Sequence, residues 1–413
     1  SMKEGTAGDV ATLALMRRFD YAVMTKGVDF LKAVGPSGIS KERFPYYGHF
    51  YASMGLVLFG EEMGAEQVAK EYVEAAAKDV LAWQAEDGSW PLKGWMSGRP
   101  QDAAYGTAFA ALCFLGAGVT HKGGPTRPLE LVEYRKRVFA ALSFLTRNQV
   151  RSDDKKKAGN LGGNMYAHAL GTMALCEAYG LSQDENLKLY AQMAVRYLSE
   201  SQHKEGGWRY GPNQAGDMSA TAWVFLAIRS AQLAGLPLGR SQLIRAERFV
   251  NSCAVGPEGA KNSRYCYTPP TEETPGSPRM ALSAAGLLTR QYLGWKKDNP
   301  DLLAGCKYLA SNLPPESAGS LGEIYYYHYA TQVLHHMEGP EFDLWNHRMR
   351  EHLLRTQETE GHRAGSWSPQ GAAYGDRGGR IYATAMALLT LQTYYRHLPM
   401  YRAVDRSTAK TGG

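Results

Sequence analysis

Gln84-Ala-Glu-Asp-Gly88-Ser-Trp90 is the first of three copies of one pattern, which is a Gln, three residues, a Gly, one residue and a Trp. The second copy is Gln202-His-Lys-Glu-Gly206-Gly-Trp208. The third copy is stretched and runs from Gln357 through Gly361 to Trp367. Each copy lies between a long stretch with a polar face and a short stretch that is almost uncharged. Such recurrence predicts a repeat architecture.

Seven short apolar stretches, rich in small residues, recur with a period of about 55 residues. They begin at Tyr47, Tyr105, Tyr166, Met218, Met280, Tyr326 and Tyr382. Charged residues rarely interrupt them, which is typical of helices that are buried on all sides. We therefore expect these stretches to be inner helices that pack closely against one another.

A longer helical pattern with one polar face precedes each apolar stretch. The clearest runs from Asp184 to Gln202, where Ser182-x-x-Glu185 reads as a capping box and apolar residues recur at helical spacing. The others are Glu66–Gln84, Leu129–Gln149, Ser241–Cys253, Asn299–Asn312 and Glu341–Gln357, with Met24–Ala33 as a shorter candidate. The alternation predicts an all-α fold of six to seven helical hairpins, in which an outer ring wraps an inner ring.

Composition supports a single domain. No linker divides the 413 residues, so we expect one toroid over residues 1–402 and a disordered, polar tail over residues 403–413. The net charge of +6 is small and dispersed, and it predicts no nucleic-acid partner. No apolar run is long enough to span a membrane, although a peripheral membrane contact stays open. The sequence leaves the oligomeric state open.

The cysteines and the N-terminus bear on the compartment. Five scattered cysteines without a Cys-x-x-Cys pair show no disulfide framework and mildly favour a reducing, cytoplasmic compartment for a soluble protein. Ser1-Met2 looks like a cloning remnant, so a removed N-terminal leader stays open.

The three Trp-containing copies, together with the small-residue helices, resemble the squalene cyclase and protein prenyltransferase superfamily over about residues 24–398. This resemblance implies an α/α toroid around a central cavity and a hydrophobic, isoprenoid-like small molecule as ligand. In that superfamily the Gln ties a helix end and the Trp packs over the turn. We therefore expect a structural role for Trp90, Trp208 and Trp367.

The superfamily's acid motif is incomplete in this chain. Class II terpene cyclases carry Asp-x-Asp-Asp-Thr-Ala at the start of an inner helix, and one acid there protonates the substrate. The matching stretch here is Asp217-Met-Ser219-Ala220-Thr-Ala-Trp223. Ser219 and Ala220 replace the two central acids, so proton-initiated cyclisation is not expected. Asp217 either caps its helix or remains a candidate acid.

The zinc site of the protein prenyltransferases is also incomplete. Tyr327-His328-Tyr329 resembles the His part of that site, but the preceding inner helix has no Asp-x-Cys. We therefore expect neither a metal nor another cofactor.

Histidines and tyrosines gather where the inner helices begin. One aligned column holds His49, Thr107, His168, Ala220, Leu282, His328 and Thr384. Equivalent positions in a ring face one axis, so these residues could line a small-molecule pocket, or they could be hydrogen-bonded core residues. The expected ligand-binding set is Tyr47, His49, Asp102, Tyr105, Tyr166, His168, Asp217, Trp223, Tyr326, His328, Arg380 and Tyr382, and the best candidates for catalysis are Asp217, His328 and His168.

Three classes of function fit these residues. Aromatic faces suit an isoprenoid chain or a carbocation, which favours a binding protein or an enzyme for hydrophobic small molecules. The degraded acid motif favours a non-catalytic binding or scaffold toroid. The mixture of Tyr, His, Arg and Asp would also suit a polysaccharide lyase or hydrolase.

Overall fold

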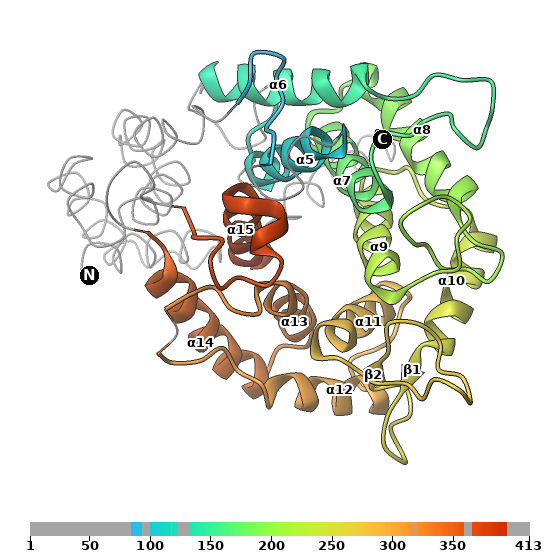
Figure 1. Cartoon of the computed structure of the whole chain (residues 1–413), viewed down its shortest axis with the longest axis vertical. Helices are drawn as coiled ribbons and strands as arrows, with labels where there is room; N and C mark the ends of the chain where they lie inside the picture. Colours follow the sequence, from blue (N-terminus) through green and yellow to red (C-terminus); the bar gives the residue numbers. More distant parts are fainter. Residues whose placement is uncertain are drawn as a thin grey trace, which may run out of the picture.

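The described part of the chain is a closed toroid of helices (Figure 1). The computed structural model describes residues 84–92, 100–116, 118–122, 132–317, 319–358 and 366–394. Within these ranges eleven α-helices alternate between an inner and an outer position. The inner ring closes because its last helix packs against its first. The predicted all-α toroid is confirmed, with six inner helices in the described ranges.

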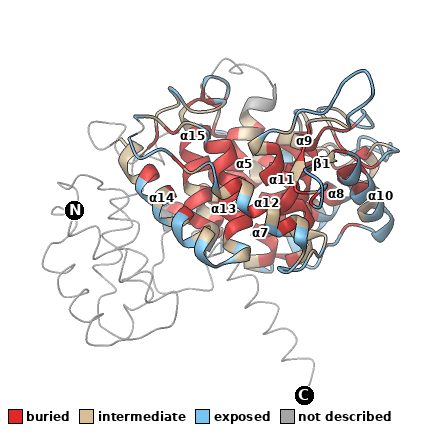
Figure 2. Cartoon of the chain, turned by 90° about the horizontal axis from the view of Figure 1, so that it is seen from below, coloured by how far each residue is buried: buried red, intermediate tan, exposed pale blue. Residues whose placement is uncertain are grey.

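The inner helices are almost entirely buried (Figure 2). They are α5 (Pro100–Gly116), α7 (Met165–Ser182), α9 (Met218–Leu233), α11 (Met280–Tyr292), α13 (Ile324–Met337) and α15 (Gly375–Leu391). Three of them begin within one residue of the predicted start. Helix α5 begins earlier, at a proline suited to a first helical turn. Helix α15 has a kink at Gly379, whose φ of 64° favours glycine.

Five outer helices match the predicted stretches to within about three residues at each end, while the predicted Met24–Ala33 and Glu66–Gln84 stretches lie outside the described residues, apart from Gln84 itself. The five helices are α6 (Val132–Arg147), α8 (Glu185–Ser201), α10 (Arg240–Ser252), α12 (Pro300–Ala310) and α14 (Pro340–Thr356), and a 3₁₀ turn, η2 (Gln392–Tyr394), follows α15. The predicted capping box is wrong. Ser182 ends α7, and Asp184 caps α8 by accepting a hydrogen bond from the Asn186 amide. Among the described helices, none combines the length and apolarity needed to cross a bilayer.

A short antiparallel hairpin interrupts the helical pattern after α10. Its strands are β1 (Ala254–Val255) and β2 (Arg264–Tyr265), with Ala254 opposite Tyr265. The hairpin lies in the connection between α10 and α11, where the sequence pattern predicted no strand. Strands of two residues are too short to give a readable alternation of apolar and polar residues.

The Gln of the second copy joins two outer helices. The Gln202 amide at the end of α8 donates to the carbonyls of Gly206 (2.8 Å) and Gln242 (2.9 Å), the latter in α10. Gly206 has a φ of 104°, and a Cβ there would collide with the Arg245 carbonyl. The pattern therefore needs glycine at this position for both conformation and space.

The Trp of the second copy closes the same turn over the inner layer. The Trp208 indole donates to the Leu198 carbonyl (2.8 Å), and its backbone N–H donates to the Thr221 hydroxyl (3.0 Å). Trp208 is 1% exposed. Trp367 repeats both bonds with Leu353 (2.9 Å) and Thr384 (3.1 Å). We call this combination of Gln and Trp bonds the clasp.

A fourth clasp without a Trp escaped the sequence search. The Gln149 amide donates to the carbonyls of Gly159 (3.1 Å) and Tyr190 (2.9 Å), which joins α6 to α8. Leu161 occupies the Trp position, and its amide donates to His168 (3.2 Å). The pattern of Gln, three residues, Gly, one residue and Trp did not find this copy, because its turn is longer and it has no Trp.

Replacing Trp208 with Ala should destabilise the fold by about 3–5 kcal/mol, because a large buried aromatic side chain is lost together with its hydrogen bond. Chemical denaturation monitored by circular dichroism measures this change. Phe139 is 60% exposed on α6, so Phe139→Ala is the matched control and should change stability by less than about 0.5 kcal/mol. Equal effects of the two substitutions would contradict the clasp.

Candidate functional site

The N-terminal ends of the inner helices share one register. The cap residues Asn164, Asp217, Arg279 and Glu323 begin α7, α9, α11 and α13. In α7, α9 and α11 the fourth residue after the cap accepts a backbone N–H from the preceding turn, and Thr107 of α5 and Thr384 of α15 accept equivalent bonds. These bonds join Leu161 to His168 (3.2 Å), Trp208 to Thr221 (3.0 Å), Tyr265 to Ser283 (3.1 Å), Trp90 to Thr107 (2.9 Å) and Trp367 to Thr384 (3.1 Å).

His168 is one of these acceptors, and the prediction that it faces the axis is wrong. Its Nε2 lies 3.0 Å from the Ala194 carbonyl, and its ring packs edge-on against Tyr197 of α8, 4.6 Å between centroids. The side chain therefore lies between the inner and outer layers. The predicted column also placed Ala220 and Leu282 one residue too early, because the hydrogen bonds identify Thr221 and Ser283 as the equivalents.

The residues that do face the axis lie two positions before this column. They are Tyr105, Tyr166, Ser219, Ala281, Tyr325 and Tyr382. The Ser219 hydroxyl lies 2.8 Å from the Tyr166 hydroxyl and 3.1 Å from the Tyr325 hydroxyl. Burial raises the pKa of Tyr325 to about 12 and that of Tyr166 well above its usual value. Three neutral hydroxyls from α7, α9 and α13 thus form a hydroxyl chain across the mouth of the ring.

Aromatic rings meet at the axis beneath the hydroxyl chain. Phe109 of α5 contacts Trp223 of α9 edge to face, with centroids 6.0 Å apart, and it also contacts Tyr382 of α15 at 5.9 Å. Trp223 contacts Tyr329 of α13 at 5.9 Å. Four helices on different sides of the ring therefore contribute to one aromatic floor. The structure brings Trp223 and Tyr382 together as predicted members of the set.

His328 lies one position after the acceptor column, and it is the one large side chain at that position among the six described inner helices. The corresponding residue of the other five inner helices is alanine: Ala108, Ala169, Ala222, Ala284 and Ala385. The His328 ring stacks on Trp223 at 5.9 Å. Its Nε2 lies 3.1 Å from the Gln332 amide nitrogen, and its Nδ1 lies 3.5 Å from the Thr390 hydroxyl. His328 thus reaches the aromatic floor.

Asp217 is the helix cap that one of the two sequence interpretations proposed. Its Oδ1 accepts the Ala220 amide at 2.8 Å, and the residue is fully buried. Burial raises its pKa above that of an ordinary aspartate, while hydrogen bonds from Ala220 and the Tyr267 hydroxyl oppose the rise. The residue that faces the axis from this turn is Ser219, not Asp217.

Residues from two loops extend the mouth outward. The hydroxyls of Tyr210 and Tyr267 lie 2.8 Å apart, and the Tyr210 ring packs against Tyr166, with centroids 5.8 Å apart. The Arg209 guanidinium lies over both loop tyrosines, at 5.7 and 5.9 Å from their centroids. This cationic and aromatic edge continues the axis-facing tyrosines toward solvent, and we call it the rim.

The rim has a second arm above α13. Tyr374 packs edge-on against Tyr325 at 5.4 Å, and the Arg377 guanidinium lies 5.4 Å from the Tyr374 centroid. Sequence reasoning missed all these loop residues because it followed helix positions. The recurrence of an arginine beside a tyrosine, in Arg209-Tyr210 and in Tyr374 with Arg377, was the available signal.

The other predicted residues lie elsewhere, and two of them need correction. The Tyr326 hydroxyl donates to the Leu309 carbonyl (2.7 Å) and its ring packs on Trp345, so it faces the outer layer. Arg380 binds Ser366 and Glu358 beside the third clasp, away from the axis. Tyr105 keeps its place at the mouth and donates to Asn164 (2.8 Å). Tyr47, His49 and the side chain of Asp102 lie outside the described residues.

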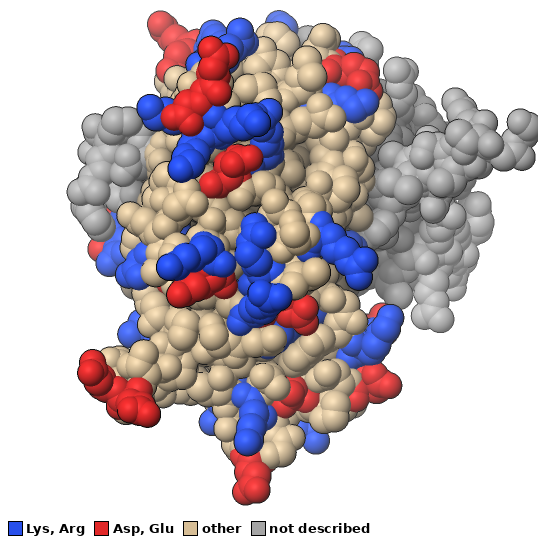
Figure 3. Space-filling model, turned by 90° about the vertical axis from the view of Figure 1, so that its right-hand side faces the viewer, with Lys and Arg blue, Asp and Glu red and all other residues tan. Residues whose placement is uncertain are grey.

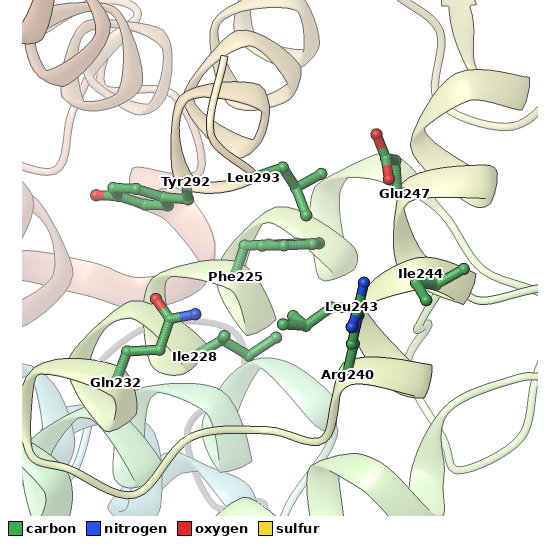
Figure 4. A pocket seen from close by; sticks show the side chains of 9 residues that line it. All are labelled: Phe225, Ile228, Gln232, Arg240, Leu243, Ile244, Glu247, Tyr292 and Leu293. Atoms are coloured by element: carbon green, nitrogen blue, oxygen red, sulfur yellow. The ribbon is translucent and has the colours of Figure 1, made fainter. Parts of the chain in front are cut away.

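A separate pocket opens on the outer side of the ring (Figure 4). It has a volume of about 190 Å³ and lies between α9, α10 and the end of α11. Phe225 and Ile228 contribute to its apolar wall, while Arg240 and Glu247 stand on α10. It does not reach the aromatic floor.

In the part of the chain that the structure describes, neither the surface charges nor the metal-ligating side chains indicate a second site. Basic and acidic side chains are interspersed on the face that includes α10 (Figure 3), as expected from the small net charge. Among the described residues, no group of three or more His, Cys, Asp or Glu side chains could hold a metal ion.

Comparison with curated proteins identifies a distant relative. A segment of 198 residues, 46% of this chain, is 28% identical to drimenyl diphosphate synthase from Streptantibioticus cattleyicolor. It covers 32% of that protein, so the match spans about a third of the relative's length. No protein-family model matches the chain.

Solved structures share the fold at low sequence identity. An α-1,6-mannanase of glycoside hydrolase family 76 from a Salegentibacter species has a TM-score of 0.53 and 11% identity, over 78% of this chain and 98% of that chain. The type II terpene cyclase MstE from Scytonema, in complex with its substrate geranylgeranyl dihydroxybenzoate, has a TM-score of 0.50 and 11% identity, over 79% and 97%. These likenesses show the α/α toroid fold.

Replacing His168 with Thr should flatten the acid side of the stability profile. Burial lowers the pKa of His168 from 6.5 to about 4. Between pH 6.5 and 4, His168 is therefore protonated in the unfolded chain but not in the native state. His168 alone should lower the free energy of unfolding by about 3 kcal/mol between pH 6.5 and 4. Thr at this position can still accept the Leu161 N–H, as in the other repeats.

Urea denaturation at several pH values measures this difference between wild type and variant. His347 is exposed on α14, so His347→Thr serves as the control and should keep the wild-type slope. A His168→Thr protein with an unchanged acid slope would show that another group titrates.

Proposed function

We propose that this chain, an α/α toroid with distant homology to a terpene-forming diphosphate synthase, binds an isoprenoid-like molecule at the mouth of its inner ring. The observation that carries the proposal is the aromatic floor beneath the hydroxyl chain, to which α5, α9, α13 and α15 all contribute. Aromatic faces bury apolar carbon and also stabilise positive charge. They suit the tail of an isoprenoid better than a hydrated sugar.

The rim suits an anionic head group on the same ligand. Arg209 and Arg377 each lie over a tyrosine ring at the mouth. A guanidinium held by such stacking presents several N–H donors in a fixed plane and is well matched to phosphate oxygens. A prenyl diphosphate would therefore place its head at the rim and its tail toward the axis. The name of the distant relative points to the same class of compound.

The rings of the aromatic floor already touch one another. A short tail can rest on the hydroxyl chain and on Tyr325, whereas a longer tail requires Trp223 to turn aside. This arrangement limits how deeply a ligand enters. The His328 imidazole, stacked on Trp223, would be the first titratable nitrogen group that a deeper tail meets.

Class II terpene cyclases, which this sequence resembles, carry the acid that protonates the substrate at the third position of their motif. The mouth of this chain has no carboxylic acid there. Ser219 holds that position, and its hydroxyl bonds to Tyr166 and Tyr325. An aliphatic hydroxyl cannot protonate an alkene, because general acid catalysis needs a group whose pKa lies near the working pH. We therefore propose binding at this site without proton-initiated cyclisation.

The fold likeness to a mannanase favours no second function. A variant of that enzyme with two aspartates replaced is inactive and was captured with α-1,6-mannotriose. Among the described residues of this chain, the adjacent pair Asp153-Asp154 is exposed in the loop before α7, where Asp154 pairs with Lys157. Neither carboxylate belongs to the aromatic mouth.

Replacing Arg209 with Gln should weaken the binding of farnesyl diphosphate about tenfold, since a charge-assisted hydrogen bond contributes about 1.5 kcal/mol or more. Binding of farnesol, which lacks the diphosphate, should stay unchanged. Isothermal titration calorimetry measures both affinities. Arg248 is exposed on α10, and Arg248→Gln is the matched control with wild-type affinities. If the wild-type protein bound neither ligand, the proposed function would fail.

Replacing Tyr325 with Leu should weaken farnesol and farnesyl diphosphate alike, by about tenfold, because the tail loses an aromatic face. The neighbouring Tyr326 is buried in the same helix but faces the outer layer, so Tyr326→Leu should leave both affinities unchanged. Equal losses in the two variants would mean that the effect is one of stability rather than contact.

Incubation of the wild-type protein with squalene or oxidosqualene should return the starting material, because Ser219 replaces the acid. Gas chromatography with mass spectrometry detects any cyclic product. A cyclic triterpene that disappears in Asp217→Asn would identify the buried Asp217 carboxyl as a working acid and overturn this expectation.

A further inference from the structure

We propose that Cys253 and Cys266 form a reversible disulfide that locks the rim of the mouth. The two residues lie opposite one another across the start of the hairpin. Ala254 pairs with Tyr265, so the preceding register position pairs Cys253 with Cys266. The Cys266 amide donates to the Cys253 carbonyl at 2.9 Å, which confirms this pairing.

Cross-strand geometry brings the two thiols within reach of one another. Directly opposite residues that share a hydrogen bond have Cα atoms about 5.5 Å apart and side chains on the same face. Disulfides most often join Cα atoms about 5.5–6 Å apart. Both cysteines are free in this structure, so bond formation needs side-chain rotation and little backbone movement.

The thiols are buried but close to an exposed segment. Cys253 is fully buried and Cys266 is 3% exposed. A Cβ on Gly276 would lie 2.6 Å from the Cys266 Sγ, so the exposed segment around Gly276 covers this sulfur. Burial raises the pKa of both thiols, that of Cys253 to about 12. The exchange should therefore be slow and should follow opening of this segment.

The chemistry requires an oxidant, for which a small-molecule disulfide is sufficient. One thiolate attacks the small disulfide, forms a mixed disulfide and releases one small thiol. The second cysteine then attacks the mixed disulfide, forms the Cys253–Cys266 bond and releases the other small thiol. The protein loses two protons and two electrons, and the small disulfide gains them.

Tyr267 connects this bond to the mouth. Its carbonyl accepts the Met218 amide (2.8 Å) at the start of α9, and its hydroxyl meets Tyr210. A disulfide at the preceding residue would fix the segment after β2 that carries Tyr267. The oxidised protein should therefore hold the first turn of α9 and the rim more rigidly than the reduced protein.

The test compares the folded protein after incubation with oxidised glutathione or with dithiothreitol. Remaining thiols are alkylated in denaturant, and peptides are mapped by mass spectrometry. The expected result is one linked peptide pair containing Cys253 and Cys266, with Cys113, Cys176 and Cys306 alkylated. Oxidation should raise Tm by about 4 °C, as for closure of a loop of about 15 residues, and dithiothreitol should reverse the rise.

Matched variants separate the pair from the other cysteines. Cys266→Ser should abolish the shift in Tm, whereas Cys306→Ser, at a similarly buried thiol, should keep it. Hydrogen exchange at the Met218 amide should slow about tenfold on oxidation of the wild type. The proposal is overturned if both cysteines remain alkylated or carry only glutathione once exchange is complete. It is also overturned if the linked protein shows no change in Tm or in exchange at Met218.

Discussion

One hydrogen bond holds the two layers of this toroid in register. It runs from a backbone N–H in the turn before an inner helix to a side chain of that helix, which lies four residues beyond the cap in α7, α9 and α11. The bond recurs at Trp90, Leu161, Trp208, Tyr265 and Trp367. A buried amide without a partner costs about 1–3 kcal/mol, so each turn demands an acceptor at that position. The acceptor fixes which helix faces point outward and which line the axis.

The architecture was predictable because it rests on repetition. Small residues without charge indicate the inner helices, and the polar-faced stretches give the outer ones to within a turn. The Gln and Trp pattern located the turns that carry Trp90, Trp208 and Trp367, and the second copy makes both the Gln and the Trp bonds. The hairpin and the Gln149 clasp were not predictable, since neither follows the spacing of the other copies. In both places backbone hydrogen bonds, rather than side-chain pattern, determine the structure.

The candidate site was harder to predict than the fold. An alignment error of one residue rotates a helical position by about 100°, enough to exchange the axis for the outer layer. Tyr326 was misplaced for this reason, whereas His168 was aligned correctly but belongs to a column that faces the outer layer. Tyr166, Trp223, His328 and Tyr382 lie toward the axis. The rim was invisible because Tyr210, Tyr267 and Tyr374 lie in loops, where no periodicity reports orientation.

The axis-facing positions of the mouth are unequal in size. Four of them are tyrosines, but the adjacent helices α9 and α11 present Ser219 and Ala281 instead. The near-sixfold symmetry of the ring is therefore broken on one side. The mouth presents a phenol on four sides and a small side chain on the remaining two. The toroid thus has one chemically distinct side at its mouth, although its backbone repeats almost evenly around the axis.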